Sequence, residues 1–187
     1  MSLSIQVYIM KTIELITVTL VLMVCSAACS YPNIEGTWRD INTIDGNTDG
    51  QRINGNLEYV FSPRSPKSGD VVSKLYGTII LDGIGSYDFH TEAYGTYTQE
   101  RHTLDIAYYP DSALVKTAFH PTSYLMGLLA SSSIKDIEAM IKESMPSADN
   151  EDSLNEHWSD FKVKEEKLSF IMGEDKYHTF IKVDKEK

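Results

Sequence analysis

The sequence predicts a mainly β protein, an antiparallel β-barrel with a helical insertion before its last strands. Short segments of alternating apolar and polar residues recur at a spacing of about 8–12 residues as far as Phe119, which indicates a β-sandwich or a barrel. After Pro121 the apolar residues recur at helical spacing instead, and strand-like segments return near Phe161. Of the two β architectures we predict the barrel.

Each predicted strand alternates apolar and polar side chains or forms a short apolar run between turn residues. Leu57, Tyr59 and Phe61, for example, occupy every second position, as in a strand with one buried face. Gly83 and Gly85 mark a turn between two such segments. The predicted strands are 34–41, 56–61, 71–81, 86–90, 93–98, 103–109, 113–119, 161–164, 167–172 and 176–183.

The predicted helical insertion spans residues 121–159. Isoleucines recur at helical spacing in its first half, after a Ser-Ile-Lys-Asp segment with the form of a capping box, and residues 124–130 predict a short preceding helix. In the second half, apolar residues at i, i+4 and i+7 predict another short helix. These patterns consist of Ile134, Ile137 and Ile141, and of Leu154, Trp158 and Phe161.

The first 28 residues are typical of a secretory leader, with Met10 as a possible true start and Lys11 as its positive end. The apolar run that follows is shorter than the roughly 20 residues that a membrane-spanning helix needs. We therefore predict a leader over residues 1–28, a tether over 29–33 and a single domain over 34–187.

The end of the leader, Ser26-Ala27-Ala28-Cys29, resembles the lipobox of bacterial lipoproteins. The resemblance implies that Cys29 is acylated and becomes the first residue, so that the partner of this end is a membrane. Each acyl CH₂ buried in lipid contributes about 0.8 kcal/mol, so several chains would anchor the protein firmly. By the same analogy, Ser at position 30 implies the outer membrane, with the domain facing the periplasm. Ordinary cleavage after Ala28 is the alternative.

The charge and the cysteines limit the possible partners. The formal net charge is −10, and this field repels nucleic-acid phosphates, which excludes a nucleic-acid partner. Cationic partners are favoured, although an acidic surface also simply keeps a protein in solution. Both cysteines, Cys25 and Cys29, belong to the leader region, so the domain has no disulfide framework.

The sequence contains no signature of catalysis. Nucleophile elbows, phosphate loops and dinucleotide fingerprints are missing, so we predict a protein that is not an enzyme, with no catalytic residues and no cofactor. His90 and Glu92 share one face of a strand and could form an acid–base couple or a surface pair, and the pair is favoured. His120, His157 and His178 are scattered along the sequence without metal spacing, and no metal site is predicted.

Residues 45–50 match the first half of a calcium loop, with ligand oxygens at Asp45, Asn47 and Asp49. The twelfth position is Asn56 rather than the bidentate Glu on which affinity depends. Asp-Gly is also an ordinary turn dipeptide, so a tight turn is the favoured alternative.

Three short motifs resemble lipocalin-like (calycin-type) lipoproteins of Bacteroidetes. They are Gly36-Thr37-Trp38, then Gly95-Thr96-Tyr97 with Leu104-Asp105-Ile106, and finally 167–170 with 180–183. The resemblance implies an up-and-down barrel that binds a ligand and has no shared catalytic residue. On physical grounds Trp38 is expected in the core rather than against a ligand, since indole supplies a large buried area. The tyrosines could line a cavity or fill a small barrel, and filling is favoured: Tyr87, Tyr94, Tyr97, Tyr108 and Tyr109.

These observations lead to two functional hypotheses. The first is a membrane-anchored, periplasm-facing, non-enzymatic lipoprotein that binds a small hydrophobic ligand or a protein. The alternative is an inhibitor or immunity-type protein that binds a basic protein through its acidic surface and helical insertion. A pocket of several hundred Å³ would favour a small ligand. A filled barrel with an exposed apolar face over 134–145 would favour a protein partner.

Overall fold

The computed structural model of the protein describes residues 31–48, 51–143, 145–173 and 176–183. The chain divides into two units, Met1–Tyr31 and Pro32–Lys187. The predicted leader and the predicted lipidation site Cys29 lie outside the described residues. Among the helices that are described, none combines the length and the apolar character needed to cross a membrane.

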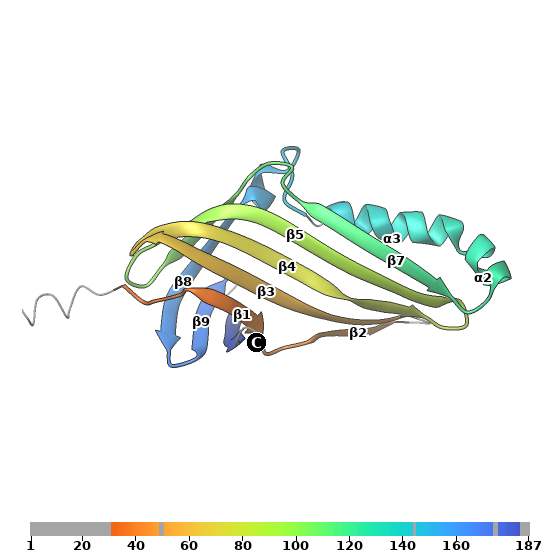
Figure 1. The fold of residues 1–187 in the computed structure, drawn as a ribbon, viewed down its shortest axis with the longest axis horizontal. Helices are drawn as coiled ribbons and strands as arrows, with labels where there is room; N and C mark the ends of the chain where they lie inside the picture. Colours follow the sequence, from red (N-terminus) through yellow and green to blue (C-terminus); the bar gives the residue numbers. More distant parts are fainter. Residues whose placement is uncertain (1–30, 49–50, 144, 174–175, 184–187) are drawn as a thin grey trace, which may run out of the picture. The chain divides into compact units, whose positions relative to one another are not determined.

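Eight antiparallel strands close into a barrel, which confirms the predicted fold class (Figure 1). The ring is closed by pairing between its first and last members, where Thr37 lies opposite Val60. In order around the barrel the strands are β1 (Gly36–Asp40), β10 (Lys176–Val183), β9 (Lys167–Met172), β8 (Asn155–Lys164), β6 (Leu104–Tyr108), β5 (Gly85–Gln99), β4 (Ser68–Leu81) and β3 (Gln51–Ser65).

Three of these strands, β3, β4 and β5, continue beyond the barrel as a curved sheet (Figure 1). Their outer parts pair with two strands that are not members of the ring, β2 (Ile44–Thr48) on β3 and β7 (Leu114–Pro121) on β5. We call this part the open sheet. It consists of β2, residues 51–55 of β3, 74–81 of β4, 85–92 of β5, and β7.

The predicted ends of several strands are wrong, because the strands of the structure are longer. The sequence predicts separate strands at 86–90 and 93–98, but β5 runs without a break over 15 residues. Likewise β3 extends well beyond the predicted 56–61 on both sides. The predicted segments end at polar residues, glycine and proline, which are typical of turns. In the structure these residues lie within long strands, which bend as they pass from the barrel into the open sheet.

The barrel interior is filled mainly by aromatic side chains. Trp38 is 1% exposed, and its Nε1 donates a hydrogen bond to the backbone oxygen of Ile34 at 2.7 Å, so its predicted core role is confirmed. An eight-stranded barrel is narrow enough for side chains to fill its interior, and that is the case here. The large aromatic residues of the barrel core are Trp38, Tyr59, Phe61, Tyr97, Tyr108, Trp158, Phe161, Phe170 and Phe180.

A second apolar core lies between the open sheet and the helices. The insertion forms α2 (Tyr124–Leu129), capped by the Ser123 hydroxyl, and α3 (Ser131–Glu143), which runs along the open sheet (Figure 1). Ile137 and Ile141 of α3 are buried, with Ile134 beside them, so the predicted helical spacing is confirmed. Their partners in this second core include Ile79, Leu81, Tyr87 and Phe89.

The second predicted helix is wrong. Only a short 3₁₀ turn, η1 (Glu151–Leu154), precedes β8, and both Trp158 and Phe161 lie in that strand with their side chains in the barrel core. The register of β8 shifts between Ser159 and Lys162, where Asp160 has a φ of 49°. This bulge inserts an extra residue, so two side chains three positions apart face the same way, which imitates the spacing of a helix.

Candidate functional site

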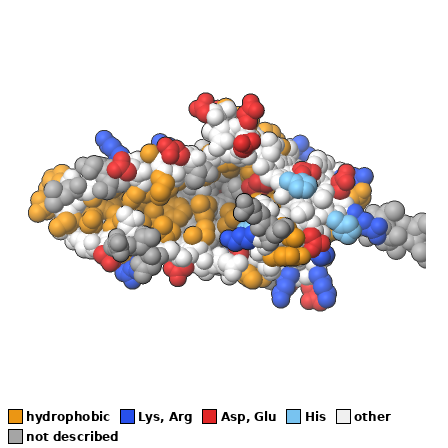
Figure 2. All heavy atoms as spheres, turned by 180° about the vertical axis from the view of Figure 1, so that it is seen from behind, with side chains coloured by type: hydrophobic (Ala, Val, Ile, Leu, Met, Phe, Trp, Pro, Cys, Tyr) orange, Lys and Arg blue, Asp and Glu red, His pale blue; other side chains and the backbone are white. Residues whose placement is uncertain are grey.

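A pocket of about 400 Å³ opens where the barrel meets the open sheet. Figure 2 shows the molecule from behind, with apolar side chains gathered on this face and the surface hollowed beside them. The pocket is lined by Leu57, Tyr59, Ser73, Leu75, Thr91, Tyr108, Met145, Pro146, Asp152, Ser153, Asn155, Glu156 and Met172. Its size is that of a site for a small molecule.

Much of the pocket wall is apolar. Leu57 and Leu75 come from β3 and β4, on the face that turns inward, and both are only partly buried. Met145, just after α3, and Met172, at the end of β9, face them from other parts of the fold. Methionine side chains are flexible and polarisable, so this wall can adjust to apolar ligands of different shape.

One carboxylate, that of Glu156, lies at the inner wall of the pocket. Glu156 is opposite Ile106 in the pairing of β8 with β6, and both face the barrel interior. The Glu156 carboxylate accepts hydrogen bonds from the hydroxyls of Tyr108 at 2.6 Å and Tyr59 at 2.9 Å. It also accepts one from Nε1 of Trp158 at 3.0 Å. Three neutral donors from three strands therefore fix its position.

The two tyrosines remain donors at all ordinary pH values. Burial raises the pKa of Tyr59 well above its usual value, and the neighbouring Glu156 carboxylate raises it further. The same two causes, in the same order, raise the pKa of Tyr108. Because neither phenol loses its proton in this range, both hydroxyls stay available as hydrogen-bond donors to the Glu156 carboxylate.

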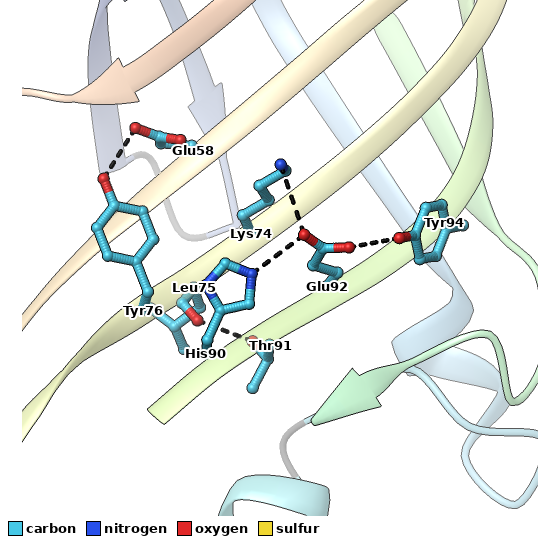
Figure 3. Close-up of polar contacts among 8 residues, drawn as sticks. All are labelled: Glu58, Lys74, Leu75, Tyr76, His90, Thr91, Glu92 and Tyr94. Atoms are coloured by element: carbon cyan, nitrogen blue, oxygen red, sulfur yellow. Dashed lines mark hydrogen bonds and ion pairs between the residues drawn. The ribbon is translucent and has the colours of Figure 1, made fainter. Parts of the chain in front are cut away.

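The sequence-predicted pair His90 and Glu92 is formed, but on the outer face of β5, away from the pocket (Figure 3). Nε2 of His90 lies 3.1 Å from the Glu92 carboxylate, and Nζ of Lys74 lies 3.5 Å from it. Hydrogen bonds from Tyr94 and His90, with the charge of Lys74, lower the pKa of Glu92 to about 2. A carboxylate that stays ionised this firmly is a poor general acid or base at neutral pH, so these contacts support the surface-pair interpretation.

Glu92 belongs to a row of alternating charges across four strands. Arg39, Glu58, Lys74 and Glu92 are successive cross-strand neighbours on β1, β3, β4 and β5. Nε of Arg39 is 2.7 Å from Glu58, which also accepts a hydrogen bond from Tyr76 at 2.8 Å (Figure 3). Opposite charges on neighbouring strands stabilise the pairing of a sheet. The row therefore stabilises the pairing of these four strands where the barrel passes into the open sheet.

Replacing Glu92 with glutamine is expected to lower stability at pH 7 by on the order of 2 kcal/mol. The pKa of Glu92 is depressed on folding, so its contribution is present above about pH 4.5, the unfolded value, and is lost as the pH falls towards 2. Urea unfolding of both proteins at pH 7 and pH 3 checks this, since the difference between them should shrink at pH 3. Glu166→Gln, at an exposed turn position, is the control and should change little. A difference that is equal at both pH values would contradict the assignment.

Three further histidines, His120, His157 and His178, do not gather into one site. His120 lies 3.1 Å from Asp88, His157 lies 2.6 Å from Asp105, and His178 lies 3.9 Å from Asp40. Each thus faces a different carboxylate. Within the described parts of the chain, no three His, Cys, Asp or Glu residues are placed to hold a metal ion.

The segment that resembles half a calcium loop forms part of a hairpin. Residues 44–48 are extended and pair with residues 51–55, with Asp45 opposite Asn54 and Thr48 opposite Gln51. A calcium loop coils around its ion rather than pairing as a strand, so these contacts speak against calcium binding. Asp45, Gly46 and Asn47 lie in β2 itself, so the tight turn predicted at the Asp-Gly dipeptide is not formed there either. Asp49, the third candidate ligand, lies outside the described residues.

The tyrosines divide between filling the interior and facing solvent. Tyr87 and Tyr97 are buried in the two cores, as the filling interpretation expects. Tyr108 is both buried and part of the pocket lining, whereas Tyr94 and Tyr109 are exposed on the outside.

Comparison with known proteins gives no match, either to a protein-family model or to a curated protein. The resemblance to lipocalin-like lipoproteins therefore stays a prediction, and the pocket geometry supplies the argument for function.

Proposed function

We propose that this protein is a membrane-anchored, periplasm-facing lipoprotein that binds a small apolar molecule in the pocket at the barrel mouth and does not alter it chemically. The observation that carries the proposal is the pocket itself, about 400 Å³ in volume, with leucine and methionine walls and one positioned carboxylate. A concave, mainly apolar site with a few converging polar groups is typical of small-molecule binding.

The anchor part of the proposal depends on acylation of Cys29. Phase separation in a detergent that clouds on warming tests it: we expect the wild type in the detergent phase and Cys29→Ala in the aqueous phase. Two or more acyl chains bind membranes stably, which is why the partition should be nearly complete. An aqueous wild type would refute the anchor and leave the pocket argument untouched.

Binding can be tested with the neutral apolar dye N-phenyl-1-naphthylamine, whose fluorescence rises in apolar surroundings. We expect saturable binding to the wild type and at least about a tenfold weaker affinity for Leu57→Trp, because the larger side chain fills the pocket. Leu114→Trp is the matched control, since Leu114 is 40% exposed on β7 and is not among the pocket-lining residues. Circular dichroism melting of all three proteins checks the fold.

Two results would count against this proposal. The first is an absence of saturable dye binding by the folded wild type. The second is an equal loss of affinity in Leu57→Trp and Leu114→Trp, which would place the dye somewhere other than the pocket.

A second function, the binding of a basic protein, is favoured by the surface of the helices. On α2, Tyr124 is 84% exposed, Leu125 61% and Leu128 58%, and Met140 of α3 is 55% exposed. Large exposed apolar side chains that lie close together often mark protein contacts, and the net charge of −10 suits a cationic partner. Retention of one basic periplasmic protein by the wild type, and not by the double variant Leu125→Glu and Leu128→Glu, would support this function.

A further inference from the structure

We infer that the ligand of the pocket carries a positively charged amine, which Glu156 binds, while its apolar part lies against Leu57, Leu75 and the two methionines. This inference rests on the proposed function, because it names the chemical class of the molecule that the same pocket takes.

The charges at the pocket wall are of one sign. Its lining residues include two carboxylates, Asp152 and Glu156, and no Lys, Arg or His. Among the described residues, no basic nitrogen lies within 4.0 Å of Glu156. Glu156 is partly buried, and a partly buried carboxylate with no cationic partner nearby attracts a cation that enters the pocket.

The partly buried carboxylates on the outer wall contrast with Glu156. Glu58 is paired with Arg39 at 2.7 Å, and Glu92 with Lys74 at 3.5 Å. Glu156 is held by two phenols and an indole instead. Among the residues that the structure describes, the carboxylates of the charge row thus have basic partners, whereas the carboxylate of the pocket has none.

The carboxylate also retains free acceptor capacity. Its two oxygens together offer about four acceptor positions. Oε2 accepts from Tyr59 and Trp158, whereas Oε1 accepts only from Tyr108. An ammonium group, which has three donors, can complete the shell of Oε1 with a charge-assisted hydrogen bond. Because three donors already fix the carboxylate, no rearrangement opposes binding.

This arrangement sets an order of affinity among ligands with the same chain. An ammonium gains the attraction of Glu156, an alcohol of equal length gains only apolar burial and a neutral hydrogen bond, and a carboxylate meets a like charge. Octylamine, octanol and octanoate each contain eight carbon atoms, one of which is the carboxyl carbon in octanoate, and they differ chiefly in charge at pH 7.5, where an alkyl amine is protonated.

The experiment measures displacement of N-phenyl-1-naphthylamine from the full chain by these three compounds. In the wild type we expect octylamine to bind about tenfold more tightly than octanol, and octanoate to bind more weakly than octanol. In Glu156→Gln the ratio of amine to alcohol affinity should fall to near one. Asp88→Asn, which removes one charge from the exposed outer face, is the control and should keep the wild-type ratio.

The wild-type series alone can overturn the inference, whatever the stability of the glutamine variant. Equal affinities for the three compounds, or tighter binding of octanoate than of octylamine, would refute the inference that the ligand is cationic. If the dye still binds saturably, the proposed function is not affected by that result. An unchanged ratio in folded Glu156→Gln would also refute it. If the folded wild type does not bind the dye, the proposed function is refuted, and the inference that depends on it is refuted as well.

Discussion

Trp158→Ala is expected to reduce the free energy of unfolding by about 3–5 kcal/mol, the largest effect of any single change considered for the barrel. The Trp158 side chain is fully buried and stacks on Phe170, with ring centroids 3.8 Å apart and an interplanar angle of 3°. It also meets Tyr59 edge to face at 4.9 Å. Alanine would leave a cavity in the middle of these rings and remove a hydrogen-bond donor from Glu156.

Urea unfolding followed by far-ultraviolet circular dichroism measures this loss. Trp158→Phe should cost less, since it keeps an aromatic ring in the stack and loses mainly the donor. Tyr177→Ala is a suitable control, because Tyr177 is also aromatic but is 58% exposed on β10, and it should change stability by less than about 1 kcal/mol. A small effect of Trp158→Ala would mean that this core is not packed as described.

Gly77→Ala is expected to destabilise the open sheet by roughly 2–3 kcal/mol. Gly77 lies between Gly55 on β3 and Phe89 on β5 in one cross-strand row. A Cβ at Gly77 would come within 2.1 Å of the backbone oxygen of Asn54 and 2.6 Å of the Cα of Gly55. Backbone atoms cannot move aside as a flexible side chain can, so the strands themselves would have to separate.

Gly46→Ala provides the matched comparison. A Cβ there would meet Ile53 at 3.8 Å, an ordinary van der Waals contact, so we expect a change of less than about 0.5 kcal/mol. Thermal unfolding of both variants measures the difference. If the two glycine replacements cost the same, close approach of β3 and β4 at Gly77 is not the reason for the glycine.

The features that the sequence predicts correctly are those with local signals. Alternation identifies most strands, and the spacing of Ile134, Ile137 and Ile141 identifies α3, because each element buries one face of its own. The errors arise where the fold overrides a local pattern. Trp158 and Phe161 have helical spacing only because a bulge separates them in β8.

The candidate site could not be predicted in the same way. Glu156 meets Tyr59 across 97 positions of sequence and Tyr108 across 48, and these contacts depend on the order of strands around the barrel. The single available signal was that Glu156 and Trp158 occupy alternate positions, which a strand interpretation of this segment would have placed on one inward face. Because the spacing of Leu154, Trp158 and Phe161 predicts a helix over this segment, the alternation of Glu156 and Trp158 is not recognised as that of a strand. His90 and Glu92, two positions apart, are the opposite case, and their pairing was visible in the sequence.

The position of Met145 gives the helix an influence on the binding site. Met145 follows α3 by two residues, is buried in the barrel core and also lines the pocket. The isoleucines of α3 itself are packed in the other core, against the open sheet. If a partner bound to the exposed side of α3 and displaced the helix along the sheet, we expect that a side chain lining the pocket would move with it. Binding at the helix and binding in the pocket would then change each other's affinity.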